Sequence, residues 1–305
     1  MGTLVIKRLF QTVLVMLGLS LIVFLVLQAT ADIAAILMPG DATTEEIEAL
    51  RHTLGLDRPL YVQYFSWLGG VVKGDFGNSY RYNLPALPLV LKRMPATLQL
   101  GVTAQLIALL VAFPLGILAA VYRGSIVDRF AMGLAMLGQS VAHFWLGLML
   151  IFVLGLRFDL LPISGTGSWL HLIMPAVTLS TRPMARTARL VRSGMLEILG
   201  QDYIRTARAK GLAEMAVVRK HALKNAMIPI VTVIGLELGS LLNGSVVVEN
   251  VFAWPGVGQL LVQSLKGRDL PVVQASVLLI AGIYVFINLV VDILYKYLDP
   301  RVRFH

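Results

Sequence analysis

The sequence predicts an all-α protein that crosses a membrane six times, with both termini in the cytoplasm. Its 305 residues are 57% hydrophobic and only 14% charged, and their mean hydropathy is +0.78. A soluble domain carries about 25% charged residues, so the composition argues against a water-soluble enzyme. The chain has no cysteine, which excludes disulfides and zinc–thiolate sites. The remaining evidence is a series of apolar runs and the distribution of basic residues around them.

A helix needs about 20 apolar residues to cross the hydrocarbon core. Five runs meet this length, at residues 9–29, 98–122, 130–156, 226–248 and 272–295. A weaker span begins near Leu170 and runs into a charged stretch after Thr181, so we expect six spans in all. Pro114 lies inside the second, where a spanning helix tolerates it. The start of the chain has a second interpretation, a cleaved signal peptide ending near Ala29-Thr30-Ala31. The apolar run of about 20 residues is longer than a usual signal core, which favours a retained first helix.

The loop charges orient these helices. With the N-terminus inside, the cytoplasmic segments hold 17 of the 26 basic residues and six acidic ones, whereas the outer segments hold nine basic and ten acidic residues. This asymmetry follows the positive-inside rule. The formal net charge of +9 is therefore mainly a signal of topology, and it does not indicate nucleic-acid binding.

A long outer segment separates the first two spans. Residues 43–55 predict a short amphipathic helix, with Thr43 and Glu46 at capping-box spacing and Gly55 at its end. An aromatic stretch at 61–67 and a turn at 74–77 follow. Two interpretations remain open for this segment: a cap that contacts a partner or the mouth of a pathway, and a collar that lies on the lipid headgroups.

Motifs for catalysis are missing from the sequence. It contains no G-x-x-x-x-G-K-[ST] loop, G-x-G-x-x-G or H-E-x-x-H motif, and its five histidines are scattered. We therefore expect no enzyme activity, no metal and no cofactor in this chain. Glu237 and Asp292 fall within the fifth and sixth spans, where carboxylates are candidates for function. For Glu237 a hydrogen bond between helices is an equal alternative, and for Asp292, close to Lys296, a structural role is favoured.

Arginines follow the fourth span at 182, 186, 189 and 192. Spacings of four, three and three keep them near one helical face, so we expect this helix to leave the bilayer with a basic stripe. Snorkelling to anionic headgroups is the simpler interpretation of the stripe. The alternative is that Arg182, the deepest, faces a cavity and meets an anionic group of a substrate.

The most informative segment is DYIRTARAKG at 202–211. Tyr203, Ile204, Ala207 and Gly211 fall on one side of the predicted helix, and Gly211 is a natural helix end. Small side chains let another protein surface approach closely, while Tyr203 and Ile204 would anchor it. A solvated basic helix is the alternative, but we favour a docking element for a partner protein.

This segment, continued by HALKNAMIP at 221–229, resembles the cytoplasmic coupling motif of ABC-importer permeases, specifically the dipeptide/oligopeptide/nickel branch. LGLDRPL at 54–60, GDFGNS at 74–79, VVVENVFAWPGVGQL at 246–260 and DPRVRF at 299–304 resemble the same branch, so the resemblance covers essentially the whole chain. Arg205 stands where the general motif has an acidic residue, and Asn243 stands where a Gly is expected.

The resemblance implies a MetI-like, type I permease bundle in a bacterial or archaeal inner membrane. It implies a second related permease, two cytoplasmic ATPases that carry ATP and Mg, a solute-binding protein, and contact with membrane lipids. The expected ATPase-coupling residues are Asp202, Tyr203, Ile204, Arg205, Thr206, Ala207, Ala209, Lys210 and Gly211. We expect three regions: residues 1–96, with the first helix and outer segment; 97–298, the permease domain with a coupling segment at 200–225; and a tail at 299–305.

The outer stretch at 246–270 contains a Pro/Gly turn flanked by aromatic residues. It predicts a re-entrant outer gate, or an interfacial loop anchored by its aromatic residues. The candidate pathway or gate residues are Arg182, Glu237, Glu249, Phe252, Trp254 and Asp269. Two other classes of protein remain: a proton-coupled secondary transporter using Glu237 or Asp292, and a membrane scaffold or receptor. Neither explains both the docking segment and the carboxylates within the spans.

Overall fold

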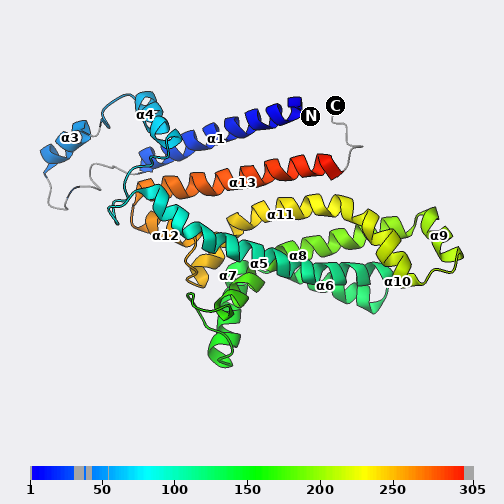
Figure 1. Ribbon diagram of the computed structural model, residues 1–305. Coiled ribbons are helices and arrows are strands. Elements are labelled where there is room, and N and C mark those ends of the chain that lie inside the picture. The colour runs from blue at the N-terminus through cyan, green and yellow to red at the C-terminus, as the bar shows by residue number, and fades with distance from the viewer. Residues whose placement is uncertain (1, 31–37, 39–42, 54, 299–305) are drawn as a thin grey trace. The chain divides into compact units, whose positions relative to one another are not determined.

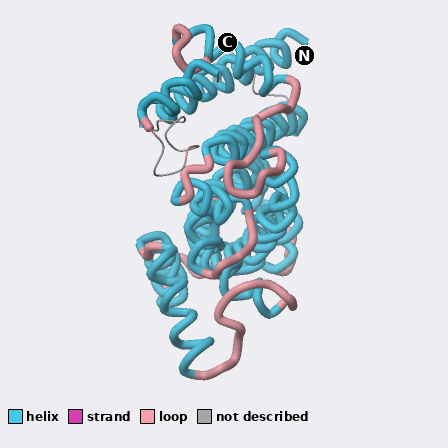
Figure 2. Tube along the Cα trace, turned by 90° about the vertical axis from the view of Figure 1, so that its left-hand side faces the viewer, coloured by secondary structure: helices cyan, strands magenta, loops and turns pink. Residues whose placement is uncertain are grey.

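The computed structural model describes residues 2–30, 38, 43–53 and 55–298. The described chain consists of helices joined by loops (Figures 1 and 2). It divides into two compact units: one contains residues 1–97 and 255–285, and the other contains residues 98–254 and 286–305. The predicted tail and the DPRVRF stretch at 299–304 lie outside the described residues, as does the side chain of Pro229.

Helices occupy all six positions predicted for spans. They are α1 (Gly2–Thr30), α5 (Ala86–Val121), α6 (Ile126–Ser140) with α7 (His143–Leu150), α8 (Leu170–Leu199), α11 (Lys224–Val251) and α13 (Leu270–Leu298). Among the described residues, three helices are long and apolar enough to span a membrane on their own: Arg8–Ala29 within α1, Ala86–Val121, and Leu270–Ile293 within α13. The third predicted span is a fourth candidate only if its two bent halves are counted together.

The expectation of one continuous third span at 130–156 was wrong. Its two halves, Ile126–Ser140 and His143–Arg157, meet at an angle of 102°, and the second half continues from α7 into the π-helix η1 (Ile151–Arg157). Val141 and Ala142 have extended backbone conformations between them. The Ser140 hydroxyl donates to the carbonyl of Met136, and such a bond from a hydroxyl to the preceding turn weakens the end of a helix. The polar residues Gln139, Ser140 and His143 interrupt the apolar run at this break, a local signal that was not used to predict it.

In the first unit, the outer segment forms α3 (Thr44–Thr53) and α4 (Leu60–Val72). The predicted capping box is confirmed: the Thr43 backbone N–H donates to Glu46 Oε2 at 2.8 Å, and the Glu46 N–H donates to Thr43 Oγ1 at 3.3 Å. Gly55 ends this turn with φ +67°, as predicted. Phe24 of α1 packs its ring at 5.5–5.6 Å from those of Tyr64 and Trp67, so α4 is fixed to α1 by aromatic contacts.

The same unit contains α12 (Val257–Lys266) and the first half of α13. Leu27 of α1 forms a small apolar cluster with Leu270 and Val273 of α13, so the end of α1 packs against the start of α13. The backbone N–H of Val257 donates to Thr97 Oγ1 at 2.8 Å. This bond ties the start of α12 to α5, because a buried N–H at a helix start needs such a partner.

The second unit is built around α8, which packs against α6 and α11. Close packing against α5 depends on Gly116, where an added Cβ would lie 2.7 Å from both the Ala188 carbonyl oxygen and Val191 Cβ. As predicted, α8 continues through its arginines as one helix of 30 residues. It leads into the short helix α9 (Asp202–Ala209), then α10 (Glu214–Ala216) and the π-helix η2 (Val217–Leu223), which joins α11.

Candidate functional site

The segment from Asp202 to Gly211 forms α9 and the turn that ends it. Gln201 precedes the helix in an extended conformation, and its carbonyl accepts the N–H groups of Ile204 and Arg205 at 3.1 and 3.4 Å. Gly211 has φ +78°, and its N–H donates to the Arg208 carbonyl at 2.9 Å. A residue with a Cβ is strained in this left-handed region, so glycine gives α9 its abrupt end, as the sequence predicts.

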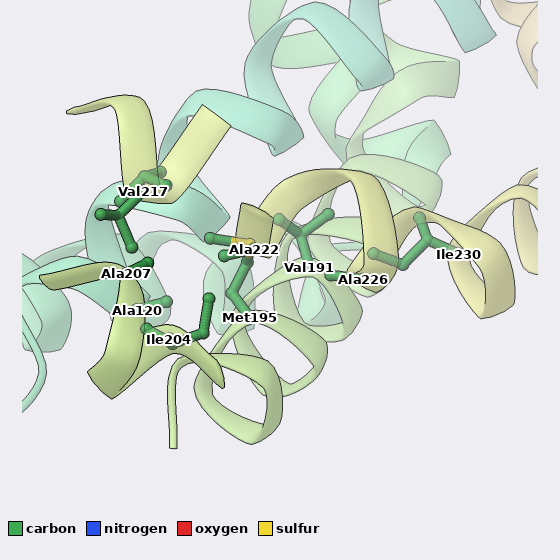
Figure 3. Packing of buried hydrophobic residues seen from close by; sticks show 10 residues of the cluster. Ala120, Val191, Met195, Ile204, Ala207, Val217, Ala222, Ala226 and Ile230 are labelled. Carbon is green, nitrogen blue, oxygen red and sulfur yellow. The ribbon is translucent and has the colours of Figure 1, made fainter. Parts of the chain in front are cut away.

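Two side chains attach α9 to the second unit. Ile204 is fully buried and Ala207 is 7% exposed. Figure 3 shows both within an apolar cluster shared with α5, α8, η2 and α11. The remaining cluster members are Ala120, Val191, Met195, Val217, Val218, Ala222, Ala226 and Ile230. The helix is therefore a rigidly packed extension of the bundle at these two positions.

This packing corrects the docking face drawn from the sequence. Ile204 and Ala207 were expected to face a partner, but they face other helices of the same chain. The physical reason is that the short turns before and after α9 hold it against the bundle, where Ile204 and Ala207 meet the apolar cluster. The residues of this segment that remain exposed are Asp202, Tyr203, Arg205, Thr206, Arg208, Ala209, Lys210 and Gly211.

The exposed face is polar and mostly basic. Tyr203 is 42% exposed, and its hydroxyl oxygen accepts a hydrogen bond from Asn225 Nδ2 at 2.9 Å. Arg208 donates through Nε and Nη2 to the two carboxylate oxygens of Glu214, at 3.0 and 2.6 Å. This bond from Arg208 holds the pKa of Glu214 below its ordinary value of 4.5. The fork-shaped pair fixes the turn after α9, since bidentate geometry is specific.

A cavity of about 710 Å³ lies in the second unit, between α6, α7, α8 and α11. Its polar lining includes Gln139, His143, Arg182, Arg186, Glu237, Ser240 and Asn243. Its volume falls within the roughly 300–1,000 Å³ typical of small-molecule sites. Two residues singled out by the sequence, Arg182 and Glu237, are thus brought to one cavity, although 55 positions separate them.

The basic stripe of α8 is engaged mainly with protein groups. Arg186 Nη1 lies 2.7 Å from Glu237 Oε1, and the side chain of Glu237 is only 8% exposed. The Ser240 hydroxyl also donates to Glu237 Oε2 at 3.2 Å. Arg189 donates to Gln139. Glu237 is therefore both a contact between α8 and α11 and part of the cavity wall, which joins the two interpretations that the sequence left open.

Arg192 of the stripe forms a bidentate ion pair with Asp128. Its Nε and Nη2 donate to the two oxygens of Asp128 at 2.6 and 2.8 Å. Asp128 is 5% exposed and also accepts the N–H of Gly124 at 2.9 Å. No role was predicted for Asp128 from the sequence. The available signal was Ser125 three residues earlier, whose side chain accepts the Asp128 N–H, because this spacing marks a helix start.

Arg182 differs from the other three arginines. Among the residues that the structure describes, it has no hydrogen-bond or ion-pair partner. It lies 12 residues into α8, or about 18 Å along the helix. Its cavity neighbour His143 has a buried Nε2 that also lacks a hydrogen-bond partner. A cationic side chain at the centre of a spanning helix costs about 2.5–3.5 kcal/mol, so an unpaired arginine is a candidate for function.

The predicted gate residues are buried. In the second unit, Glu249 is fully buried, while Phe252 and Trp254 are 2% and 4% exposed. The Phe252 ring packs against Gly147 of α7, where an added Cβ would lie 3.1 Å from it, and its carbonyl accepts the N–H of Gly165 at 3.0 Å. These aromatic side chains thus hold the end of α11 in place within the unit.

In the first unit, Asp269 is also fully buried. Its carboxylate accepts the Ser79 hydroxyl at 2.5 Å and the Tyr80 N–H at 3.1 Å. The GDFGNS stretch and the residues before α13 are therefore joined through one carboxylate. Ser79 is the last residue of the GDFGNS stretch at 74–79. Nothing in the neighbouring sequence indicates that its partner, Asp269, lies 190 residues away. No group of three or more His, Asp or Glu side chains that could hold a metal occurs within the described part of the chain.

The helical bundle, the polar cavity and the exposed helix α9 are the features expected of the transmembrane subunit of a transporter. Residues 112–304 match the family model of the binding-protein-dependent transport system inner membrane component. Residues 1–101 match the model of the N-terminal part of such membrane components. The chain belongs to this family of ABC-importer permeases: it is an inner-membrane subunit, and ATP is bound by partner ATPase subunits.

Curated relatives and solved structures agree with this assignment. The chain is 41% identical over 332 aligned positions to the dipeptide transport system permease protein DppB of Escherichia coli K12, covering 98% of both chains. It is 43% identical over 301 positions to the glutathione transport system permease protein GsiC of the same strain, again covering 98% of both. The inward-facing MetNI methionine ABC transporter has a similar fold, with a TM-score of 0.59, 22% identity, and coverage of 69% of this chain and 96% of the other.

Proposed function

We propose that this chain forms half of a translocation pathway for dipeptides or similar short peptides, and that α9 couples it to a cytoplasmic ATPase. The relatives that match 98% of the chain are named for dipeptide and glutathione transport, which supports short peptides as the substrate class. A second, related permease completes the pathway, a second ATPase docks on that subunit, and a solute-binding protein delivers the peptide. Both termini and α9 lie on the cytoplasmic side, in keeping with the distribution of basic residues.

The observation that carries this proposal is the division of α9 into two faces. Ile204 and Ala207 are packed into the bundle, while Tyr203, Arg205 and Thr206 are exposed. A helix that is rigidly attached on one side and free on the other transmits the displacement of a docked partner to the helices behind it. Its neighbours in the apolar cluster include residues of α8 and α11, and both of these helices also line the cavity.

The two ends of this path are connected through α8. Movement of α9 acts first on Met195 and Val191 of α8, which share its cluster. Arg186 and Arg182 lie at the cavity on the same helix, about 2.5 and 3.6 turns from Met195. Because an α-helix is stiff over this distance of about 20 Å, a displacement at α9 reaches the cavity without an intervening loop.

The test is uptake into proteoliposomes that hold this chain with its partner permease, ATPases and binding protein, while the proton gradient is collapsed. We expect ATP-dependent accumulation of dipeptide in the wild type. Arg205→Glu, which reverses a charge on the exposed face of α9, should abolish uptake, whereas the matched reversal Arg129→Glu on α6 should not. Gly211→Pro should also abolish it, because proline cannot adopt φ +78°. Normal uptake by both α9 variants would contradict the assignment.

A further inference from the structure

The cavity of the second unit has an unequal charge balance. Of its two arginines, Arg186 is neutralised by Glu237 at 2.7 Å, whereas Arg182 has no such partner among the described residues. His143 adds a buried Nε2 without a hydrogen-bond partner. The cavity therefore presents one uncompensated positive charge and one unsatisfied ring nitrogen to whatever enters it.

We propose that Arg182, with His143 beside it, is the seat for the terminal carboxylate of the transported solute. This inference rests on the proposed function, and it adds the chemical group that the permease itself recognises. A guanidinium presents parallel N–H donors that match the two oxygens of a carboxylate. The imidazole Nε2 donates a third hydrogen bond in the tautomer that carries its proton there.

The paired charges explain why Arg182, and not Arg186, takes this role. The carboxylate of Glu237 is held by Arg186 Nη1 and by the Ser240 hydroxyl, so the positive charge of Arg186 is already compensated by a carboxylate of the protein. Arg182 and Arg186 are one helical turn apart, a rise of about 6 Å. The seat is thus separated along α8 from the Glu237 pair by about the length of a dipeptide backbone.

The surroundings of the seat are built for a close approach. Gly244 of α11 lies beside His143, where an added Cβ would stand 3.7 Å from the imidazole Cε1 and 3.2 Å from Leu179 Cδ1. A side chain at this position would reduce the space between α7, α8 and α11. With a cavity of about 710 Å³, the site accommodates a short peptide and leaves its carboxylate within reach of the wall.

The experiment compares two solutes, dialanine and its C-terminal amide, in proteoliposomes holding the complete transporter. Each solute is supplied at a concentration that loads at least roughly nine-tenths of the binding protein, as follows from its measured Kd, so that delivery is equal. The quantity measured is the ratio of the initial uptake rates, carboxylate over amide. ATP hydrolysis is followed in parallel as a check on assembly.

We expect the wild type to favour the carboxylate, and Arg182→Gln to lower the ratio at least about tenfold, because a charge-assisted hydrogen bond is lost. The matched variant Arg129→Gln removes the same charge from α6 outside the cavity lining and should keep the wild-type ratio. Arg182→Met, of similar length and also neutral, replaces Arg182→Gln if that variant does not assemble.

The outcomes separate this inference from the proposed function. An unchanged ratio in the Arg182 variant, or an equal loss of both solutes, overturns the carboxylate seat. A wild type that accumulates neither solute with ATP contradicts the proposed function instead. A ratio that falls in the Arg182 variant but stays unchanged in Arg129→Gln supports the seat directly.

Discussion

Truncation of Ile204 tests whether α9 must be firmly packed to transmit force. Ile204 is fully buried, and Ala207 is the other buried side chain of the helix. Substitution of a buried Ile by Ala costs about 2–5 kcal/mol. Most of this loss falls on the attachment of α9, because the helix has eight residues and Ile204 and Ala207 are its two buried side chains. The population of detached helix should therefore rise at least about 25-fold, as a loss of 1.4 kcal/mol corresponds to a factor of ten.

The assay for Ile204→Ala has two parts. Hydrogen exchange measured on the assembled transporter reports the attachment of α9, and we expect faster exchange at residues 202–211. The amount of peptide imported per ATP hydrolysed reports coupling, and we expect it to fall while hydrolysis continues. Met215→Ala is the matched control, since Met215 is 68% exposed in α10, the short helix that follows α9. Unchanged exchange together with an unchanged transport ratio would refute the mechanism.

Three further predictions concern stability. Gly116→Ala should lower the thermal midpoint because its Cβ would meet α8 at 2.7 Å, whereas Gly133→Ala, with nothing within 4 Å, should raise stability by up to about 1 kcal/mol through helix propensity. Arg192→Ala should lower the free energy of unfolding of the second unit by about 3–5 kcal/mol, because it leaves the buried Asp128 carboxylate without its ion-pair partner. Denaturant unfolding measures this change. A decrease in the free energy of unfolding below about 1 kcal/mol would mean that water solvates the carboxylate. The pKa of Glu214 is lowered in the folded state, so its ion pair is intact above pH 4.5 and is lost as the pH falls through the lowered pKa. Hydrogen exchange at 208–214, corrected for its intrinsic pH dependence, should therefore increase only in acid, and Glu214→Gln should remove this pH dependence.

Local rules were sufficient for several parts of this protein. The capping box of Thr43 and Glu46, the glycine end of α9 at Gly211 and the continuation of α8 through its arginines each depend on residues within a few positions of one another. Hydropathy placed a helix at all six predicted positions, because the length of an apolar run directly reflects the thickness of the bilayer. These features follow from backbone geometry and solvation, which act at short range along the chain.

The orientation of α9 could not be obtained in this way. Periodicity placed Ile204 and Ala207 on one face of the helix, correctly, but it does not state which surface that face meets. The expectation of a partner surface was wrong because Val217 and Met195, on neighbouring elements, fill the same apolar cluster. Only the folded arrangement shows that this face is already occupied.

The sequence by itself determined the class of protein and the positions of its five long helices, α1, α5, α8, α11 and α13. Only the tertiary structure revealed the 102° bend in the third predicted span. It also showed which carboxylates pair with the arginines of α8: Arg192 pairs with Asp128, 64 residues away, and Arg186 pairs with Glu237, 51 residues away. The physical reason is that a charge in a low-dielectric interior must find a partner wherever the fold brings one, and that choice is made by packing between helices. Arg182 was already a candidate from its position in the sequence, but only the folded structure distinguished it from Arg186 and Arg192, which have carboxylate partners.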